Sequence, residues 1–318
     1  MCYSAQIVQE YEKYVRTLGA QVDLDAFVRL YWERRDNPAI KIPKAMDAQF
    51  ARPGSDQARE IKALIDEYDR SQAARLEQEL FRQRKRLADA ERVLQARTTK
   101  AASESRRIAT DKIARARGKL DDLRRTALED RDSRIFPGHY APVMVWQDGR
   151  RVLRPMRYQC RPAGKPASHD RRYPGTYNAR RDNLEGFWKG QFGLSHGIVV
   201  MNAFYENVSR HDLERRALAP GEDPQNVVLE FRPEPAQDML VACLWSHWQH
   251  GDETLLSFAA ITDEPPPEIA RAGHDRCVVP IRPGNIDAWL NPDASALPAQ
   301  YAILDDRQRP YFQHRMAA

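Results

Sequence analysis

Residues 141–158, APVMVWQDGRRVLRPMRY, contain two runs rich in β-branched and aromatic side chains, 143–146 and 152–158, around an Asp-Gly turn. This pattern predicts two short strands. Similar runs follow, separated by Pro-Gly and Pro-rich turns, with few helices between them. The fold class expected is α+β, with a mainly antiparallel, barrel-like sheet and peripheral helices. The further predicted strands are residues 197–204, 227–231, 240–245, 255–262 and 277–281.

Upstream of these strands, residues 55–134 have a different composition. They contain no proline, a single glycine (Gly118), and 21 Lys and Arg against 16 Asp and Glu. Apolar residues recur at intervals of three and four, which predicts two long amphipathic helices, antiparallel, with a turn near residues 99–103. Ser55 is the expected N-cap. We call residues 55–134 the helical arm.

The arm divides the predicted domain in two. We expect one catalytic domain from residues 1–54 and 135–318, into which the arm is inserted as a helical, coiled-coil-like hairpin. Residues 24–32 show helical spacing within the first part. Two interpretations of the arm stay open: a solvated hairpin stiffened by i,i+4 ion pairs, or a basic arm that contacts the DNA backbone, a partner protein or a second copy of the chain.

Composition limits the class of protein. The 318 residues are 42% hydrophobic and 30% charged, with a mean hydropathy of −0.71, so a core-forming part and a highly charged part are expected. No run approaches the ~20 apolar residues of a membrane span, and Met1 leads into polar sequence without a signal peptide. We therefore predict a soluble, cytoplasmic protein. Its net charge of +5 permits a nucleic-acid partner.

The four cysteines give neither a CxxC pair nor a disulfide framework, so no metal site and no cofactor are predicted. Cys2 has a distinct chemistry. Removal of Met1 would leave its α-amine and thiol on adjacent carbons, and both groups have ordinary pKa values near 8. Such a 1,2-aminothiol condenses with an aldehyde to an imine, which the thiol closes to a thiazolidine. The alternative is an ordinary small N-terminal residue.

Four other residues could take part in proton transfer or in substrate binding. Glu206 ends a predicted strand and His274 precedes another, which makes an acid/base pair. Asn178 and Arg180 lie in an Asn-Ala-Arg turn and could bind an oxyanion or a phosphate. Each also has a purely structural interpretation: a surface charge, a core histidine, or half of a surface ion pair.

Together these motifs resemble the SOS-response-associated peptidase (SRAP) family, whose members protect abasic sites in single-stranded DNA through a covalent crosslink. The motifs occur in the family's order, and Leu244-Trp245 is similar to a family strand. The resemblance rests on the N-terminal Met-Cys, Asn-Ala-Arg at 178–180, Phe-Tyr-Glu at 204–206, Ala-Ile-Thr at 260–262 and His-Asp-Arg at 274–276.

The resemblance implies a role for each matching residue. Cys2 would be the crosslinking nucleophile, Asn178 would hold the sugar, and Arg180 would bind a flanking phosphate. Glu206 would be the general acid/base, and His274 would assist imine formation and crosslink reversal. Arg276 lies in the same His-Asp-Arg segment as His274, and we expect it to be a further DNA contact. The peptidase activity in the family name is expected only as self-removal of Met1.

The DNA-contacting segments depart from the family pattern. Tyr3-Ser4 replaces the usual Gly-Arg after the cysteine, which removes a phosphate-binding arginine. The family's base-stacking strand and loop is here Arg157-Tyr158-Gln159-Cys160-Arg161-Pro162. Tyr158 is the expected stacking residue, and Arg157 and Arg161 the expected cations. These changes affect substrate geometry more than reaction type.

Three functional hypotheses follow. The first is an enzyme that binds single-stranded DNA and traps abasic sites through Cys2. The second is a scaffold whose arm docks a partner, with a catalytically drifted pocket. The third is a plain single-strand DNA binder, with salt-sensitive affinity that ignores the lesion.

Overall fold

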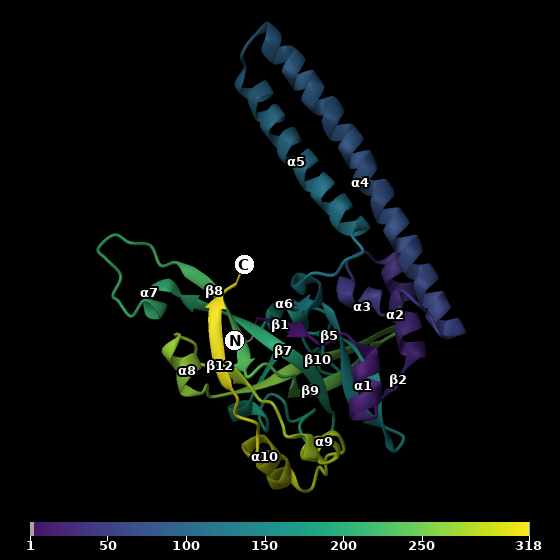
Figure 1. Ribbon diagram of the computed structural model, residues 1–318, viewed down its shortest axis with the longest axis vertical. Coiled ribbons are helices and arrows are strands. Elements are labelled where there is room, and N and C mark those ends of the chain that lie inside the picture. The colour runs from purple at the N-terminus through teal and green to yellow at the C-terminus, as the bar shows by residue number, and fades with distance from the viewer. Residues whose placement is uncertain (1–2, 318) are drawn as a thin grey trace.

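A closed five-stranded β-barrel forms the centre of the computed structural model, which describes residues 3–317 (Figure 1). Neighbouring strands around it pair antiparallel, except that β5 and β10 pair parallel and close the barrel. The fold class predicted from the sequence is confirmed, and the parallel closure is an addition to it. The barrel strands are β4 (Tyr140–Gln147), β5 (Arg150–Tyr158), β7 (His196–Ser209), β9 (Met239–His250) and β10 (Glu253–Asp263).

The barrel strands are buried on both faces. Ile198, Val199, Val200 and Met201 are consecutive in β7, and none is more than 3% exposed. Alternate residues of this run belong to two separate apolar clusters, one of which includes helices α1 and α2. Double burial explains why the strands are continuous apolar runs instead of alternating patterns.

Shorter strands extend the barrel and bring distant segments to its edges. β1 (Ser4–Ile7) pairs antiparallel with β7, with Ser4 opposite Tyr205. β6 (Asn178–Arg180) and β11 (Cys277–Val278) flank the end of β10. The others are β2 (Gln21–Val22), β3 (Arg134–Ile135), β8 (Asn226–Glu234) and β12 (Tyr311–Met316).

Peripheral helices cover the barrel. The predicted helix at 24–32 is part of α2, which Asp23 caps by accepting a hydrogen bond from the Ala26 amide. The helices outside the arm are α1 (Tyr11–Leu18), α2 (Leu24–Asp36), α3 (Lys44–Ala48), α6 (His169–Arg172), α7 (Arg210–Leu213), α8 (Pro267–Arg271), α9 (Ile286–Leu290) and α10 (Leu297–Asp305). In the described part of the chain, none is long and apolar enough to cross a membrane.

The helical arm contains the predicted antiparallel helix pair, α4 (Asp56–Ala96) and α5 (Lys100–Arg124), which projects from the barrel (Figure 1). Ser55 caps α4 as expected. The turn is at residues 97–99, earlier than predicted, because Thr99 caps α5. α5 ends at Arg124, before the end of the predicted arm at residue 134. Leu128 therefore lies outside the helix and is 47% exposed.

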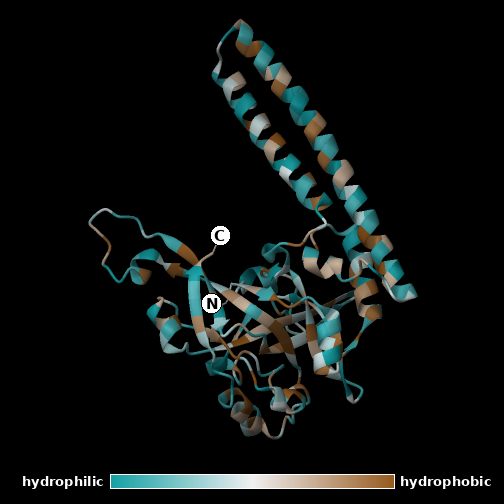
Figure 2. Cartoon of the chain, in the orientation of Figure 1, coloured by the Kyte–Doolittle hydropathy of each residue, from teal (hydrophilic) through white to brown (hydrophobic). Residues whose placement is uncertain are grey.

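Two different interfaces stabilise the arm. At its base, Ile61, Leu64 and Ile65 of α4 are buried in the core beside α2. Farther out, the buried apolar side chains are mostly small: a cluster that includes Leu80 and Leu120, and separate alanines such as Ala90 and Ala109. Figure 2 shows that hydrophilic residues predominate along both arm helices, with hydrophobic residues scattered among them.

The base of the arm should therefore contribute more to stability than its outer part. Ile61 has no exposed surface, so Ile61→Ala should lower the free energy of unfolding by about 2–5 kcal/mol. Val93→Ala, at a 42% exposed position, should change it by about 0.5 kcal/mol or less. Urea denaturation followed by circular dichroism measures both; equal effects would contradict this packing.

Candidate active site

A buried acid/base pair lies at the end of the barrel. Glu206, in the last third of β7, and His274, between α8 and β11, approach with Oε2 and Nε2 3.2 Å apart. Glu206 is 1% and His274 7% exposed. A carboxylate is stable at such depth only when it is paired. Two residues that are 68 positions apart in the sequence thus form one buried contact between a carboxylate and an imidazole.

The other ring nitrogen of His274 faces both a donor and an acceptor. Nδ1 lies 3.2 Å from the Arg276 amide nitrogen and 3.0 Å from the Arg276 carbonyl oxygen. It can accept a hydrogen bond when unprotonated and donate one when protonated. Both protonation states of the ring are therefore accommodated without movement, as a proton-transferring residue requires.

The backbone before His274 depends on a glycine. After α8 ends at Arg271, Gly273 has φ +91°, a conformation that other residues rarely adopt. A Cβ at this position would also lie 3.3 Å from Cβ of Asp212. The turn returns the chain to the barrel, and the His274 amide donates to the carbonyl of Ile269.

The end of β10 brings the Asn-Ala-Arg segment next to the histidine segment. Arg180 of β6 and Val278 of β11 are both register partners of Thr262, one on each edge of β10. Asn178, two residues before Arg180, is 6% exposed. Neither its side-chain oxygen nor its nitrogen has a hydrogen-bond partner among residues 3–317. A buried amide with unused hydrogen-bonding capacity is typical of a ligand-binding position.

Two of the predicted DNA-contacting arginines meet at one carboxylate. Arg180 forms an ion pair with Asp182 at 2.7 Å, and Arg276 approaches the same oxygen at 4.0 Å. Arg180 and Asp182 are about half exposed. Arg276 also lies 3.8 Å from a carboxylate oxygen of Asp275, so the rim of the site carries two guanidinium groups and two carboxylates. Beside it, a hollow of about 950 Å³ is lined partly by Asp182 and Cys277.

The predicted nucleophile, Cys2, lies outside the described residues, but the residues that follow it are placed. The Tyr3 ring packs edge-on against Tyr177, the neighbour of Asn178, with centroids 6.4 Å apart. Ser4 is the register partner of Tyr205, the neighbour of Glu206. The chain directly after Cys2 is thus fixed between two of the predicted catalytic residues.

Arg134 is a residue of this region that the sequence did not indicate. Its Nε and one terminal nitrogen lie 3.0 and 2.9 Å from the Ser4 hydroxyl oxygen. Its guanidinium also covers the Tyr205 ring, 3.6 Å from the centroid, and burial lowers its pKa. Arg134 places a cation beside the Tyr3-Ser4 segment, where the sequence departs from the family. A separation of 130 residues left no local signal of this contact.

The remaining predicted DNA contacts are in a different environment from the one expected. Tyr158 has no exposed surface and packs on Phe258 and Tyr177, so its ring offers no face to a base. Arg157 and Arg161 are both engaged by Asp170. Burial opposes the ionised form of Asp170, but the hydrogen bond from Arg161 and the two charges outweigh it and lower its pKa. The sequence pattern could not reveal this pairing.

The comparisons with known proteins identify the family. The model of the SOS response associated peptidase (SRAP) family matches residues 94–316. The chain belongs to this family. The matched range includes the Asn178, Glu206 and His274 segments, whereas the family resemblance at the N-terminus rests on sequence alone. A search of the curated proteins finds no match.

Three solved structures are similar to this chain at low sequence identity. A protein from Bordetella bronchiseptica is 18% identical with a TM-score of 0.46, and covers 58% of this chain and 87% of its own. A Bacteroides thetaiotaomicron protein is 13% identical with a TM-score of 0.44, covering 58% and 78%. A phage-related Bordetella bronchiseptica protein is 21% identical with a TM-score of 0.43, covering 58% and 81%.

The described cysteines should be unreactive in the folded SRAP protein. Cys160, Cys243 and Cys277 are at most 4% exposed, and burial raises the pKa of each, that of Cys160 to about 12. Because the thiolate is the reacting form, native Cys2→Ala should take up no iodoacetamide at pH 7.5, and three equivalents after unfolding in guanidinium chloride. Intact-mass spectrometry measures the uptake; native labelling of this variant would contradict the burial.

Proposed function

We propose that this SRAP protein binds single-stranded DNA and forms a covalent thiazolidine between Cys2, after loss of Met1, and the aldehyde of an abasic site. The observation that carries the proposal is the placement of Tyr3 and Ser4 beside Tyr177 and Tyr205. Consecutive Cα atoms are about 3.8 Å apart, so covalent geometry keeps the Cys2 Cα within about 7.6 Å of that of Ser4. The proposal requires this short link to bring the Cys2 amine and thiol to the Glu206 carboxylate.

The reaction consists of proton transfers that the buried pair can perform. An abasic deoxyribose is mostly a closed hemiacetal, and ring opening moves a proton from its hydroxyl to the ring oxygen. The Cys2 amine adds to the aldehyde carbon, and the carbinolamine loses water to give an imine. The thiol then adds to the imine carbon, and its proton goes to nitrogen. A carboxylate and an imidazole 3.2 Å apart are groups that can carry out these proton transfers.

The surrounding residues would hold the substrate. The buried Asn178 amide can donate to and accept from the sugar oxygens. Arg180 and Arg276, at the rim, can bind the flanking phosphates, for which Asp182 is the competing partner. Because an abasic site has no base to unstack, moving this sugar into a pocket costs little.

The proposed nucleophile can be tested by trapping. Wild-type protein, first shown by intact mass to have lost Met1, should form an SDS-resistant adduct with a single-stranded abasic oligonucleotide. Cys2→Ala should form none, because the variant lacks the thiol that closes the ring. Cys160→Ala, a buried position, is the matched control and should form as much adduct as the wild type. A persistent SDS-resistant adduct in Cys2→Ala would refute the assignment.

The acid/base pair should control the rate of adduct formation. Glu206→Gln keeps the side-chain shape but removes the carboxylate, and His274→Gln removes the titrating ring. Each should slow crosslinking by about a hundredfold or more, with a smaller loss of affinity for the same oligonucleotide. Single-turnover kinetics from pH 5 to 9 measures the rates, and the rate in His274→Gln should vary less with pH. Wild-type rates in both variants would exclude this pair from the chemistry.

A further inference from the structure

The charge of the protein is concentrated in the outer half of the helical arm. Residues 82–119, which we call the distal arm, contain thirteen Lys and Arg and four Asp and Glu, a net charge of +9. The whole chain carries +5, so the remaining residues together carry −4. At the base of α4, residues 56–81 have four basic and seven acidic side chains. The arm is therefore polarised, with its positive end farthest from the barrel (Figure 1).

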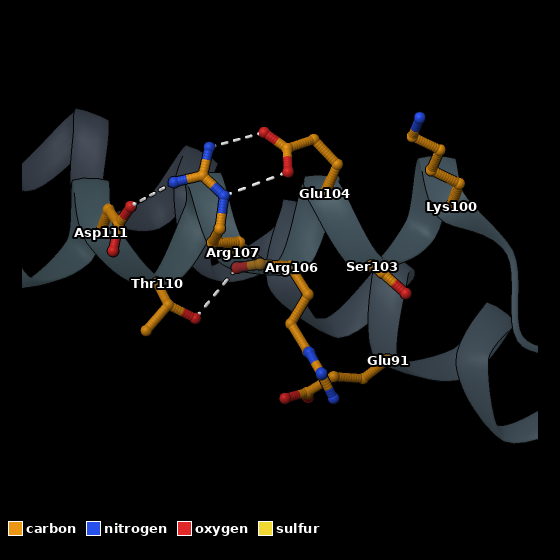
Figure 3. A pocket seen from close by; sticks show the side chains of 8 residues that line it. All are labelled: Glu91, Lys100, Ser103, Glu104, Arg106, Arg107, Thr110 and Asp111. Atoms are coloured by element: carbon orange, nitrogen blue, oxygen red, sulfur yellow. Dashed lines mark hydrogen bonds and ion pairs between the residues drawn. The ribbon is translucent and has the colours of Figure 1, made fainter.

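Most of this positive charge is not neutralised locally. Arg82, Arg92 and Arg107 have carboxylate partners on their own helices. Figure 3 shows the contrast on α5, where Glu104 and Asp111 engage Arg107, while Lys100 points away from the other labelled side chains. Nine further cations are exposed and form no ion pair within residues 3–317: Arg84, Lys85, Arg97, Lys100, Arg106, Lys112, Arg115, Arg117 and Lys119.

The distal arm lacks the groups that other classes of partner require. Residues 82–119 contain no Phe, Tyr or Trp, and Val93 is their only large apolar side chain that is exposed within residues 3–317. The nearest exposed aromatic ring is that of Phe81, which directly precedes them in α4 and is a single ring, not a row on which successive bases could stack. Protein interfaces use buried aromatic and apolar anchors, and single-strand binding uses aromatic stacking on bases. A surface with dense cations and no aromatic residue can recognise only a regular array of anionic groups.

We infer that the distal arm is a sequence-independent binding surface for the phosphate backbone of double-stranded DNA. A duplex carries one charge per about 1.7 Å of axis, the densest regular array available to it. Residues 82–96 of α4 span about 22 Å at 1.5 Å per residue, which matches six or seven base pairs. This surface extends the proposed function, because it would hold duplex flanking a single-stranded lesion, but it does not depend on that function.

A charge-neutralised variant tests the inference. Arg84→Gln, Lys85→Gln, Arg115→Gln and Lys119→Gln are combined, since Gln preserves helix propensity. The matched control combines Arg52→Gln, Arg70→Gln, Arg75→Gln and Lys189→Gln, which are exposed cations outside the distal arm. Both lose four charges. Binding of an undamaged 30-base-pair duplex is measured by fluorescence anisotropy from 50 to 300 mM KCl, with helicity checked by circular dichroism.

The distal variant should bind the duplex at least about tenfold more weakly at 100 mM KCl, and the slope of log K against log salt should fall in magnitude by about 2–4. The control should change affinity by less than about threefold. Equal loss in both variants, or none in the distal variant, would overturn the inference. Stronger arm-dependent binding of single strands, or displacement of duplex by polyglutamate at equal charge, would overturn it in favour of another partner.

The test of duplex binding by the arm can fail or succeed independently of the test of crosslinking by Cys2. The distal variant should crosslink a seven-nucleotide abasic single strand at the wild-type rate, because such a substrate contains no duplex for the arm to bind. Cys2→Ala should bind the undamaged duplex as the wild type does. Loss of duplex binding in Cys2→Ala would contradict the assignment of this binding to the arm.

Discussion

The pairing of β1 with β7 is the constraint on which the candidate site depends. The first half of β7 pairs with β4 and β9 in the barrel. Farther along, residues 201–205 pair with β1, and residues 204–209 pair with β8. This register places Ser4 opposite Tyr205 and so brings the N-terminal segment to the strand end that carries Glu206. Because a slip of one residue reverses the faces of a strand, this alignment is held by β1, in which Ala5 and Ile7 enter an apolar cluster while Ser4 and Gln6 meet polar partners.

Much of the architecture was accessible from the sequence because it depends on local patterns. Continuous apolar runs predicted the barrel strands. The recurrence of apolar residues at intervals of three and four, with Ser55 as the N-cap, predicted the arm helices. The parallel contact of β5 with β10 was not accessible, because no local pattern specifies which distant strands meet. Motif order alone identified Glu206 and His274, and their 3.2 Å contact follows only from the folded chain.

Charged side chains were harder to predict than apolar ones. The sequence shows that Arg157, Arg161 and Arg134 are cations, but not which anion or ring each one meets. Asp170 engages two of them, and Arg134 contacts Ser4 across 130 residues. A buried guanidinium must be paired to be stable, so its partner determines whether it contributes to structure or remains available to a ligand. In this site Arg180, whose side chain is 48% exposed, is the most available of these cations, whereas the Arg276 side chain is 15% exposed, as is that of Arg157.

The location of the positive charge on the distal arm, away from the barrel, has a consequence for the way in which the protein would bind DNA. The net −4 of the residues outside the distal arm repels DNA at long range, whereas the +9 of the distal arm attracts it. At physiological salt the Debye length is about 8 Å, so each surface acts mainly on the DNA nearest to it. Duplex would therefore first meet the protein at the end of α4 and α5. The arm would then raise the local concentration of DNA at the barrel without adding charge next to the buried Glu206–His274 pair.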